Sequence, residues 1–320
     1  MKAGKKMCGI KKLQLPCCIC ENPDPNGYDL LYQLPRGEVI RCSRCQLVYV
    51  NDIPPAGDDQ GDNYFAYWGM DVYEESEWLF REEFRQALDE INRLKSPPGK
   101  LLDVGCGPGY FLSEARHFGW DPVGLDISKG AVDLARKRGE NAFDCTIEEM
   151  AKKYRGKAFD CITLFNIIEH LTYPARALSA VKKLLAEGGI VVIETPTEDS
   201  LIRRTSHKIY QLSKGKVDHL TRQLYHSGGH HFGFSRKTIS MLLASQGFQV
   251  VHIKAVLSSP GIALKKRKVE LDRVQGPAEK SLQILLIGSI FLAWAGSAIL
   301  GPQQMANRMR VLAKAEDSCN

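Results

Sequence analysis

The sequence predicts an α/β protein built on a doubly wound, mostly parallel sheet, with a small cysteine-rich module at the N-terminus. Three observations lead to this prediction. An apolar strand ends in alternating glycines within residues 101–109, strand-like and helix-like segments alternate from residue 100 to residue 195, and two C-x-x-C pairs lie within the first 45 residues. Strands that alternate with helices pair in parallel, because each helix carries the chain back to the same end of the sheet.

The glycine-rich stretch predicts a ligand site. Gly105, Gly107 and Gly109 let the backbone turn sharply and approach a ligand, and the helix behind them offers unpaired N–H groups. The next strand ends in Asp126, 21 positions after Gly105 (126 − 105), where a carboxylate can accept hydrogen bonds from ribose hydroxyls. A dinucleotide motif needs glycine at the position of Tyr110, so a nicotinamide oxidoreductase is disfavoured.

Helix ends are marked by short polar side chains and glycines. Ser128 and Ser235 are predicted N-caps, and Gly119, Gly139 and Gly247 follow predicted helix ends. These signals place helices between the strands of the core.

The pattern D-x-G-x-G-x-G resembles motif I of the class I S-adenosylmethionine (SAM) methyltransferases. Residues 159–171 resemble the fourth strand of that superfamily and its following loop, and residues 184–196 resemble its helix, turn and fifth strand. The resemblance implies a Rossmann-like sheet of seven strands, in which the last strand, residues 309–314, inserts beside the sixth, residues 248–257.

The same resemblance implies the cofactor site. Glycines and an acid line the methionine half of SAM, Asp126 binds the ribose, Ile127 lies along the adenine with Thr146 near its edge, and two residues after the fourth strand complete the cleft. The full predicted cofactor-binding set is Asp103, Gly105, Cys106, Gly107, Gly109, Asp126, Ile127, Thr146, Phe165 and Asn166.

Methyl transfer also requires positioning of the acceptor and removal of its proton. Glu169 and His170 follow the fourth strand, and histidine is the natural base near neutral pH. We therefore predict Glu169, His170 and His230 as catalytic residues, with His230 as a second base or an orienting group. The alternative is a structural role, in which Glu169 and His170 cap the next helix and His230 is a loop residue whose hydrogen bonds are made within the protein.

Two enzyme classes have similar features. The O-methyltransferases of quinone synthesis have a similar loop, with an acid where this chain has Asn166, and some related enzymes bind a divalent metal through such sets. Asn166 disfavours a magnesium site here. Sugar C-methyltransferases share the cysteine module and use a histidine base.

Cys17-x-x-Cys20 and Cys42-x-x-Cys45 predict one structural Zn²⁺ in a zinc-ribbon-like module. Twenty-one residues separate the pairs (42 − 20 − 1). An interpretation as four unrelated buried cysteines is disfavoured, because so short a segment has too few apolar residues to fold without a metal or disulfide cross-link. Four thiolates leave no open position for catalysis.

The chain divides into three predicted parts. Residues 1–55 form the zinc-binding module, residues 56–96 a linker and a lid helix with helical spacing over 77–93, and residues 97–320 the methyltransferase domain. Trp78 and Phe80 are expected to pack, whereas Tyr64 and Tyr73 are candidates for the pocket. Residues 198–230 are expected to be a basic, irregular lid insertion, and residues 258–307 an apolar insertion.

The apolar insertion raises the question of a membrane. Residues 281–307 are 27 positions (307 − 281 + 1) without a charge, long enough to span a bilayer. If residues 282–300 crossed the bilayer once, the last strand would lie on the opposite side of the membrane from the sheet that it joins. We therefore expect residues 282–300 to contact a membrane peripherally, with the basic run 265–268 attracting anionic lipid. The predicted location is the cytoplasm, at the inner face of the membrane.

The overall prediction is a SAM-dependent methyltransferase that acts on a small-molecule acceptor: a sugar, a quinone-like phenol or a lipid-linked intermediate. The rival is a non-catalytic scaffold that binds a partner through its zinc module, which the intact glycine motif and Asp126 disfavour. A net charge of +6 with no basic stripe predicts no nucleic-acid partner, and the basic N-terminus lacks the apolar region of a secretory signal. The acceptor, the atom methylated and the oligomeric state stay open.

Overall fold

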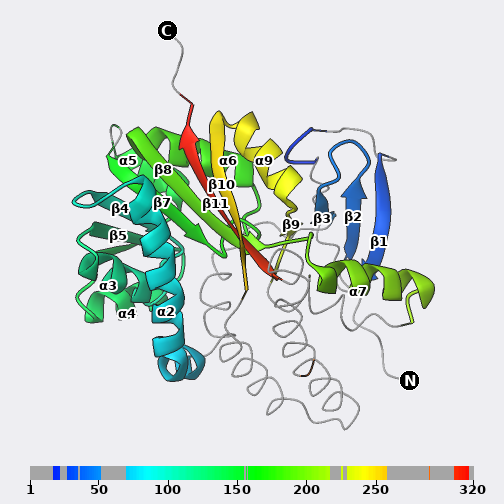
Figure 1. Ribbon diagram of the computed structural model, residues 1–320, viewed down its shortest axis with the longest axis horizontal. Helices are drawn as coiled ribbons and strands as arrows, with labels where there is room; N and C mark the ends of the chain where they lie inside the picture. The colour runs from blue at the N-terminus through cyan, green and yellow to red at the C-terminus, as the bar shows by residue number, and fades with distance from the viewer. Residues whose placement is uncertain are drawn as a thin grey trace, which may run out of the picture.

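The computed structural model contains two sheets (Figure 1). The residues it describes are 17–21, 27–34, 37–51, 70–154, 156, 158–216, 225, 229–257, 288 and 306–316. Tyr64 and the segments 258–287 and 289–305, with most of the predicted membrane contact, lie outside this set.

The large sheet has seven strands, of which six run in the same direction and one, the last strand in the chain, runs antiparallel to them. In sheet order they are β10 (Phe248–Val256), β11 (Arg308–Ala315), β8 (Leu185–Pro196), β7 (Phe159–Phe165), β4 (Lys100–Val104), β5 (Asp121–Asp126) and β6 (Ala142–Asp144). The last strand of the chain thus inserts beside β10, as predicted. The predicted fold class is confirmed.

Helices cover both faces of this sheet, since alternate strand residues point to opposite sides. The helices are α2 (Met70–Leu94), α3 (Tyr110–His117), α4 (Lys129–Lys137), α5 (Ile147–Lys153), α6 (Pro174–Leu184), α7 (Leu201–Leu212) and α9 (Arg236–Ser245). On one face α2 and α3 pack with Leu101 and Val192, and on the other α5, α6 and α9 pack with Leu102 and Val191.

The predicted helix caps form. The Ser128 hydroxyl accepts from the Ala131 N–H at 3.1 Å, and the Ser235 hydroxyl accepts from the Thr238 N–H at 3.2 Å. Gly139, just past α4, has φ of +83°, which favours glycine. Local polar side chains therefore set these helix ends.

The predicted lid helix is longer than expected, as α2 begins at Met70. Its Phe84 side chain packs edge-on against Phe111 of α3 at 5.3 Å between ring centroids, and Phe80 stacks on Phe84 at 6.4 Å. Arg81 and Arg85 both pair with Glu114 on α3. The Phe84 and Glu114 contacts fix α2 against the core, while Phe80 packs on Phe84 of the same helix.

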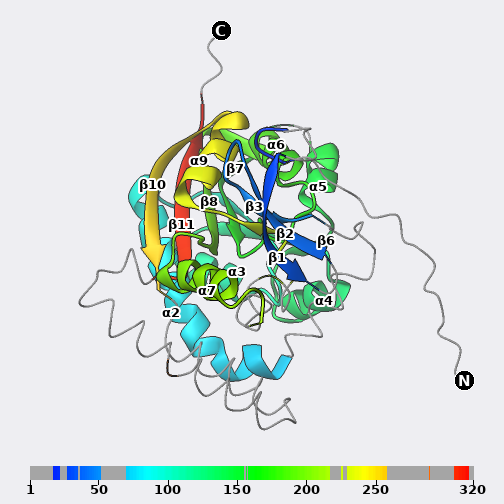
Figure 2. The same cartoon turned by 90° about the vertical axis from the view of Figure 1, so that its right-hand side faces the viewer.

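A smaller antiparallel sheet is built from the cysteine-rich segment (Figure 2). Its strands are β1 (Tyr28–Leu34), β2 (Gly37–Cys42), β3 (Val48–Val50) and β9 (Phe232–Gly233). The fourth strand, β9, follows α7 in the chain and pairs with β3, so two parts of the chain that are distant in sequence form one sheet.

Two expectations about local structure are wrong. Within residues 198–230, predicted to be irregular, the structure has α7, whose N-cap Ser200 accepts from the Arg203 N–H at 3.3 Å. The glycines after α6, expected as a separate turn, belong to β8, whose pairing with β7 shifts register there. In both places long-range packing decides the backbone conformation.

Candidate functional site

The glycine loop connects β4 to α3 at the carboxyl edge of the sheet. Gly105, Gly107 and Gly109 have φ of +78°, +52° and +84°, a region that favours glycine. A Cβ at Gly105 would collide with the Ile167 side chain, whereas one at Gly107 would meet nothing within 4 Å. Because no side chain caps the start of α3, the loop offers an open cradle in front of helix N–H groups.

Asp126 at the end of β5 holds this loop in place. One carboxylate oxygen accepts from the Gly107 N–H at 2.9 Å, and the other accepts from the Ser128 N–H at 2.8 Å. The next residue, Ile127, is 59% exposed, and Phe143 at the edge of the sheet is 41% exposed. The carboxylate and an uncovered apolar surface therefore lie together, an arrangement that suits a ribose joined to a flat apolar base.

Asp103 contributes from behind the loop. Its carboxylate accepts from the Thr163 hydroxyl at 2.6 Å, and burial raises its pKa to about 7. The Cys106 side chain packs into a small core with Leu112 and Val132, so its backbone is the part that belongs to the loop.

The remaining predicted cleft residues have structural partners. Thr146 is the N-cap of α5, in a capping box with Glu149. Phe165 packs edge-on against Phe111 at 4.8 Å between ring centroids. Asn166 has φ of +55°, a left-handed conformation that asparagine tolerates better than most side chains, and this accounts for an amide at that position.

The three predicted catalytic residues come together although His230 is 60 positions from His170. The ring centroids of His170 and His230 are 4.7 Å apart, edge to face. His170 Nε2 is 4.0 Å from Glu169 Oε1. One ligand atom from each of Glu169, His170 and His230 lies within 4.8 Å of the others, so these residues could also hold a cation.

A hydrogen bond to the backbone fixes the tautomer of His170. His170 Nδ1 lies 3.3 Å from the Gly229 carbonyl oxygen. A carbonyl can only accept, so we assign the proton to Nδ1 and the lone pair to Nε2. Burial, with a smaller effect from His231, lowers the pKa of His170 to about 4, so its imidazole is neutral at physiological pH.

Glu169 is the buried member of the group, at 1% exposure. Its Oε2 accepts from the Thr195 hydroxyl at 2.9 Å, whereas Oε1, the atom nearest His170, has no hydrogen-bond partner within the described part of the chain. Burial raises the pKa of this carboxyl to about 7. Its backbone carbonyl accepts from the His231 N–H at 2.8 Å, which joins the two histidine-bearing segments.

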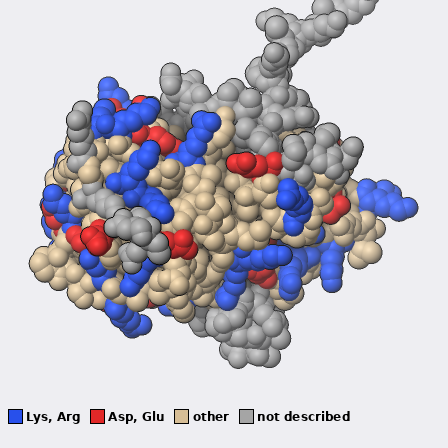
Figure 3. Space-filling view, turned by 90° about the horizontal axis from the view of Figure 1, so that it is seen from above, with Lys and Arg blue, Asp and Glu red and all other residues tan. Residues whose placement is uncertain are grey.

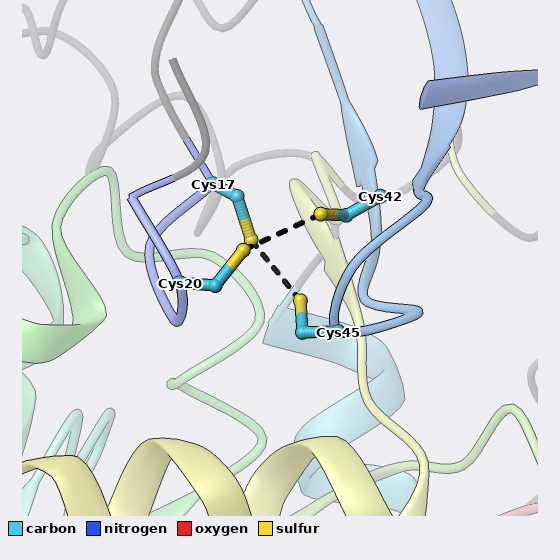
Figure 4. A group of neighbouring side chains, drawn as sticks. All are labelled: Cys17, Cys20, Cys42 and Cys45. Carbon is cyan, nitrogen blue, oxygen red and sulfur yellow. Dashed lines mark hydrogen bonds between the residues drawn. The ribbon is translucent and has the colours of Figure 1, made fainter. Parts of the chain in front are cut away.

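The four cysteines of the N-terminal module also converge (Figure 4). The sulfur atoms of Cys17 and Cys45 are 3.3 Å apart, and those of Cys20 and Cys42 are 3.4 Å apart. All four lie within 4.8 Å of one another. A tetrahedral zinc site with Zn–S of about 2.3 Å separates its sulfurs by roughly 3.8 Å, so this donor set fits Zn²⁺ with a small outward shift.

Sequence reasoning missed the residues that support the site. Thr163 and Thr195, which hold the two buried carboxyls, look like ordinary strand residues in sequence. A second missed group surrounds Glu198, whose carboxylate accepts from Arg203, His207 and Tyr225. The polar residues 197–200 after β8, which include the N-cap Ser200, were the available signal. Spacing along the chain alone does not show which side chains Glu198 contacts.

No helix in the described ranges is both long and apolar enough to cross a bilayer. The segment 282–300 lies outside those ranges apart from Gly288, so the predicted membrane contact stays a prediction.

Fold and site together define a Rossmann-like α/β protein with a glycine loop of the nucleotide-binding type and a neighbouring acid–histidine group. A family model described as a methyltransferase domain matches residues 79–253. That match spans more than half of the chain, and the chain belongs to this methyltransferase family. The predicted family is confirmed.

Curated relatives cover the central part of the chain. The chain is 32% identical over 133 residues to a ubiquinone biosynthesis O-methyltransferase of Nitrosococcus oceani, covering 37% of this chain and 56% of that relative. It is 35% identical to the enzyme of the same name from Dinoroseobacter shibae, covering 35% and 48%. The chain thus spans about half the length of the curated relatives it matches.

Solved structures show the same fold. A phosphoethanolamine N-methyltransferase 2 from Haemonchus contortus aligns with a TM-score of 0.54 at 16% identity, over 85% of this chain and 63% of that one. A cyclopropane synthase from Mycobacterium tuberculosis aligns with a TM-score of 0.52 at 17% identity, over 80% and 95%.

Proposed function

We propose that this protein transfers a methyl group from SAM to a hydroxyl of a small-molecule acceptor, with His170 accepting the proton. The observation that carries the proposal is the adjacency of two sites on one sheet edge. The open glycine loop follows β4, the Glu169–His170 pair follows the neighbouring parallel strand β7, and Ile167 packs against Gly105 between them. The names of the curated relatives support oxygen as the methylated atom.

Each of the proposed site residues has a separate role in the methyl transfer. Bound SAM supplies an electrophilic methyl group on a sulfonium sulfur. Asp126 and the glycine loop would hold its ribose and methionine parts, and the sulfur keeps the electron pair of the broken bond. The acceptor oxygen forms the new C–O bond, while its proton passes to His170 Nε2. Glu169 and His230 position that imidazole, so the reaction relies on alignment and proton removal.

We also propose that Cys17, Cys20, Cys42 and Cys45 hold one structural Zn²⁺. Support comes from the converging sulfur atoms and from the absence of an open ligand position in a four-thiolate site. The module's role is then to fix β3, because the Val50 N–H donates to the His231 carbonyl at 2.9 Å. Zinc would thereby stabilise the backbone beside His230.

Replacing Asp126 with alanine tests the cofactor assignment. We expect SAM affinity to fall roughly 10²–10⁴-fold, because two charge-assisted hydrogen bonds to a ribose are lost together with the support of the loop. Isothermal titration with SAM measures this, and Asp121→Asn, at the opposite end of β5, is the control. Unchanged SAM affinity in Asp126→Ala, or binding of NADH in place of SAM, contradicts the assignment.

We propose further that residues 282–300 rest on the inner face of a cytoplasmic membrane, which would suit a lipid-linked acceptor. Support comes from the uncharged run in the sequence and the basic residues 265–268. In cell fractionation, we expect part of the protein to pellet with membranes and to be released by mild detergent. Complete recovery in the supernatant at low salt rules this contact out.

A further inference from the structure

A hollow lined mainly by long basic and polar side chains lies between the small sheet and α7. Its volume is about 520 Å³, and all of its lining residues except Leu201 are polar or basic. Those polar and basic residues are Arg41, Arg204, Thr205, His207, Lys208 and Gln211. Figures 1 and 2 show α7 beside β1 and β2, so the hollow is formed by two segments that are distant in the sequence.

The charged side chains that line this hollow are all basic. Arg204 and Lys208 are four residues apart and therefore share one face of α7, and Arg41 comes from β2. No carboxylate is among the lining residues, although Asp29 lies opposite Arg41 in the pairing of β1 with β2. Elsewhere, on the face in Figure 3, Lys and Arg are spread out with Asp and Glu between several of them.

The nearest buried carboxylate does not neutralise the hollow. Glu198 already accepts from Arg203, His207 and Tyr225, and its pKa is lowered to about 2, with the Arg203 charge as the largest favourable contribution against burial. His207 is held on its other side by the Tyr32 hydroxyl. This buried network fixes α7 against β1, and the Glu198 carboxylate is engaged by Arg203, His207 and Tyr225 and not by Arg204 or Lys208.

Contacts of Glu198 connect His207, which lines the hollow, to the segment that follows His230. Glu198 lies against Gly233 in β9, three residues after His230, and its backbone N–H donates to the Phe234 carbonyl at 2.8 Å. Both features belong to segments that leave the carboxyl edge of the large sheet.

We propose that this hollow binds a phosphate or diphosphate group of the methyl acceptor. Two guanidinium groups can each form paired hydrogen bonds to phosphate oxygens, and Lys208 adds a point charge and Thr205 a hydroxyl donor. The inference rests on the proposed function and specifies its substrate class: a hydroxyl compound that carries a phosphate ester, either soluble or on a lipid.

The test uses the full-length protein saturated with S-adenosylhomocysteine and inorganic pyrophosphate as the probe in isothermal titration. We expect Arg204→Gln combined with Lys208→Gln to weaken pyrophosphate binding by ~10-fold or more, since two charged donors are lost. Lys214→Gln with Lys216→Gln is the matched control. It removes the same charge just beyond α7, from exposed lysines that do not line the hollow.

Each outcome separates this inference from the proposed function. Equal weakening in both double variants, or no pyrophosphate binding with intact S-adenosylhomocysteine binding, overturns the pocket and leaves the methyltransferase proposal standing. Failure of the wild type to bind S-adenosylhomocysteine overturns the proposed function instead. Loss of pyrophosphate binding in the Arg204/Lys208 variant alone, with S-adenosylhomocysteine affinity unchanged, supports the pocket.

Vesicle flotation distinguishes the source of the phosphate. Phosphatidylcholine vesicles with and without phosphatidic acid are compared for the wild type and both double variants. Flotation that needs phosphatidic acid and is lost in the Arg204/Lys208 variant alone supports a lipid phosphate. Flotation that is the same in all three proteins, with pyrophosphate binding still lost in that variant, supports a soluble phosphate ester.

Discussion

Replacing His170 with glutamine is expected to lower kcat by about two to four orders of magnitude, the usual contribution of a positioned base. A glutamine amide can still donate to the Gly229 carbonyl, so the loop keeps its anchor, but the lone pair at the position of Nε2 is gone. SAM affinity should stay near the wild-type value, because His170 follows β7 and is not part of the glycine loop that would hold SAM. Single-turnover kinetics with labelled SAM separates the two quantities.

His252→Gln is the matched control, because His252 is exposed on β10 and far from the acid–histidine group in the sheet order. It should leave kcat and SAM affinity unchanged. If His170→Gln retains wild-type kcat, His170 is a structural residue that caps its loop, and the proton must leave by another route.

The pH profile gives a second readout on the same group. Burial lowers the pKa of His170 to about 4, so the base is already neutral at pH 6 and its acid limb lies well below the usual histidine range. Burial raises the pKa of Glu169 to about 7, so a limb near neutrality would report ionisation of Glu169. Glu169→Gln should remove a limb near pH 7 and leave one near pH 4 in place.

The second large effect concerns the zinc module. Cys42→Ser with Cys45→Ser should reduce the metal content from about one zinc per chain to near zero, since two thiolates cannot hold a closed tetrahedral site. Structural zinc sites contribute roughly 10–16 kcal/mol to folding of small modules. Cys17, Cys42 and Cys45 are buried with Leu47 and Phe232, so we also expect a lower melting temperature.

Activity should fall with the metal although the module lies outside the cofactor cleft. The reason is the Val50–His231 hydrogen bond and the pairing of β3 with β9, which hold the His230 segment. Cys18→Ser is the control, because Cys18 is outside the converging group. Retention of full zinc by the double variant would remove these cysteines from the ligand set; melting temperature and metal analysis by mass spectrometry provide the measurements.

The sequence by itself determined the features whose causes are local. The caps Ser128 and Ser235 depend on residues three positions away, and the glycine loop and Asp126 belong to one strand–helix–strand unit; the structure places each as expected. The order of strands and helices followed from alternating apolar patterns, and the inserted last strand followed from the family resemblance.

Tertiary structure decided the features that depend on distant partners. β9 has two residues, too few to show a period, and is a strand because β3 offers it backbone partners. α7 was missed because its buried Arg203 and His207 look like surface residues until Tyr32 of β1 packs beside them and Glu198 pairs with both. Burial of a charge depends on a partner that spacing along the chain does not reveal, and this is why the cationic hollow on α7 emerged only in three dimensions.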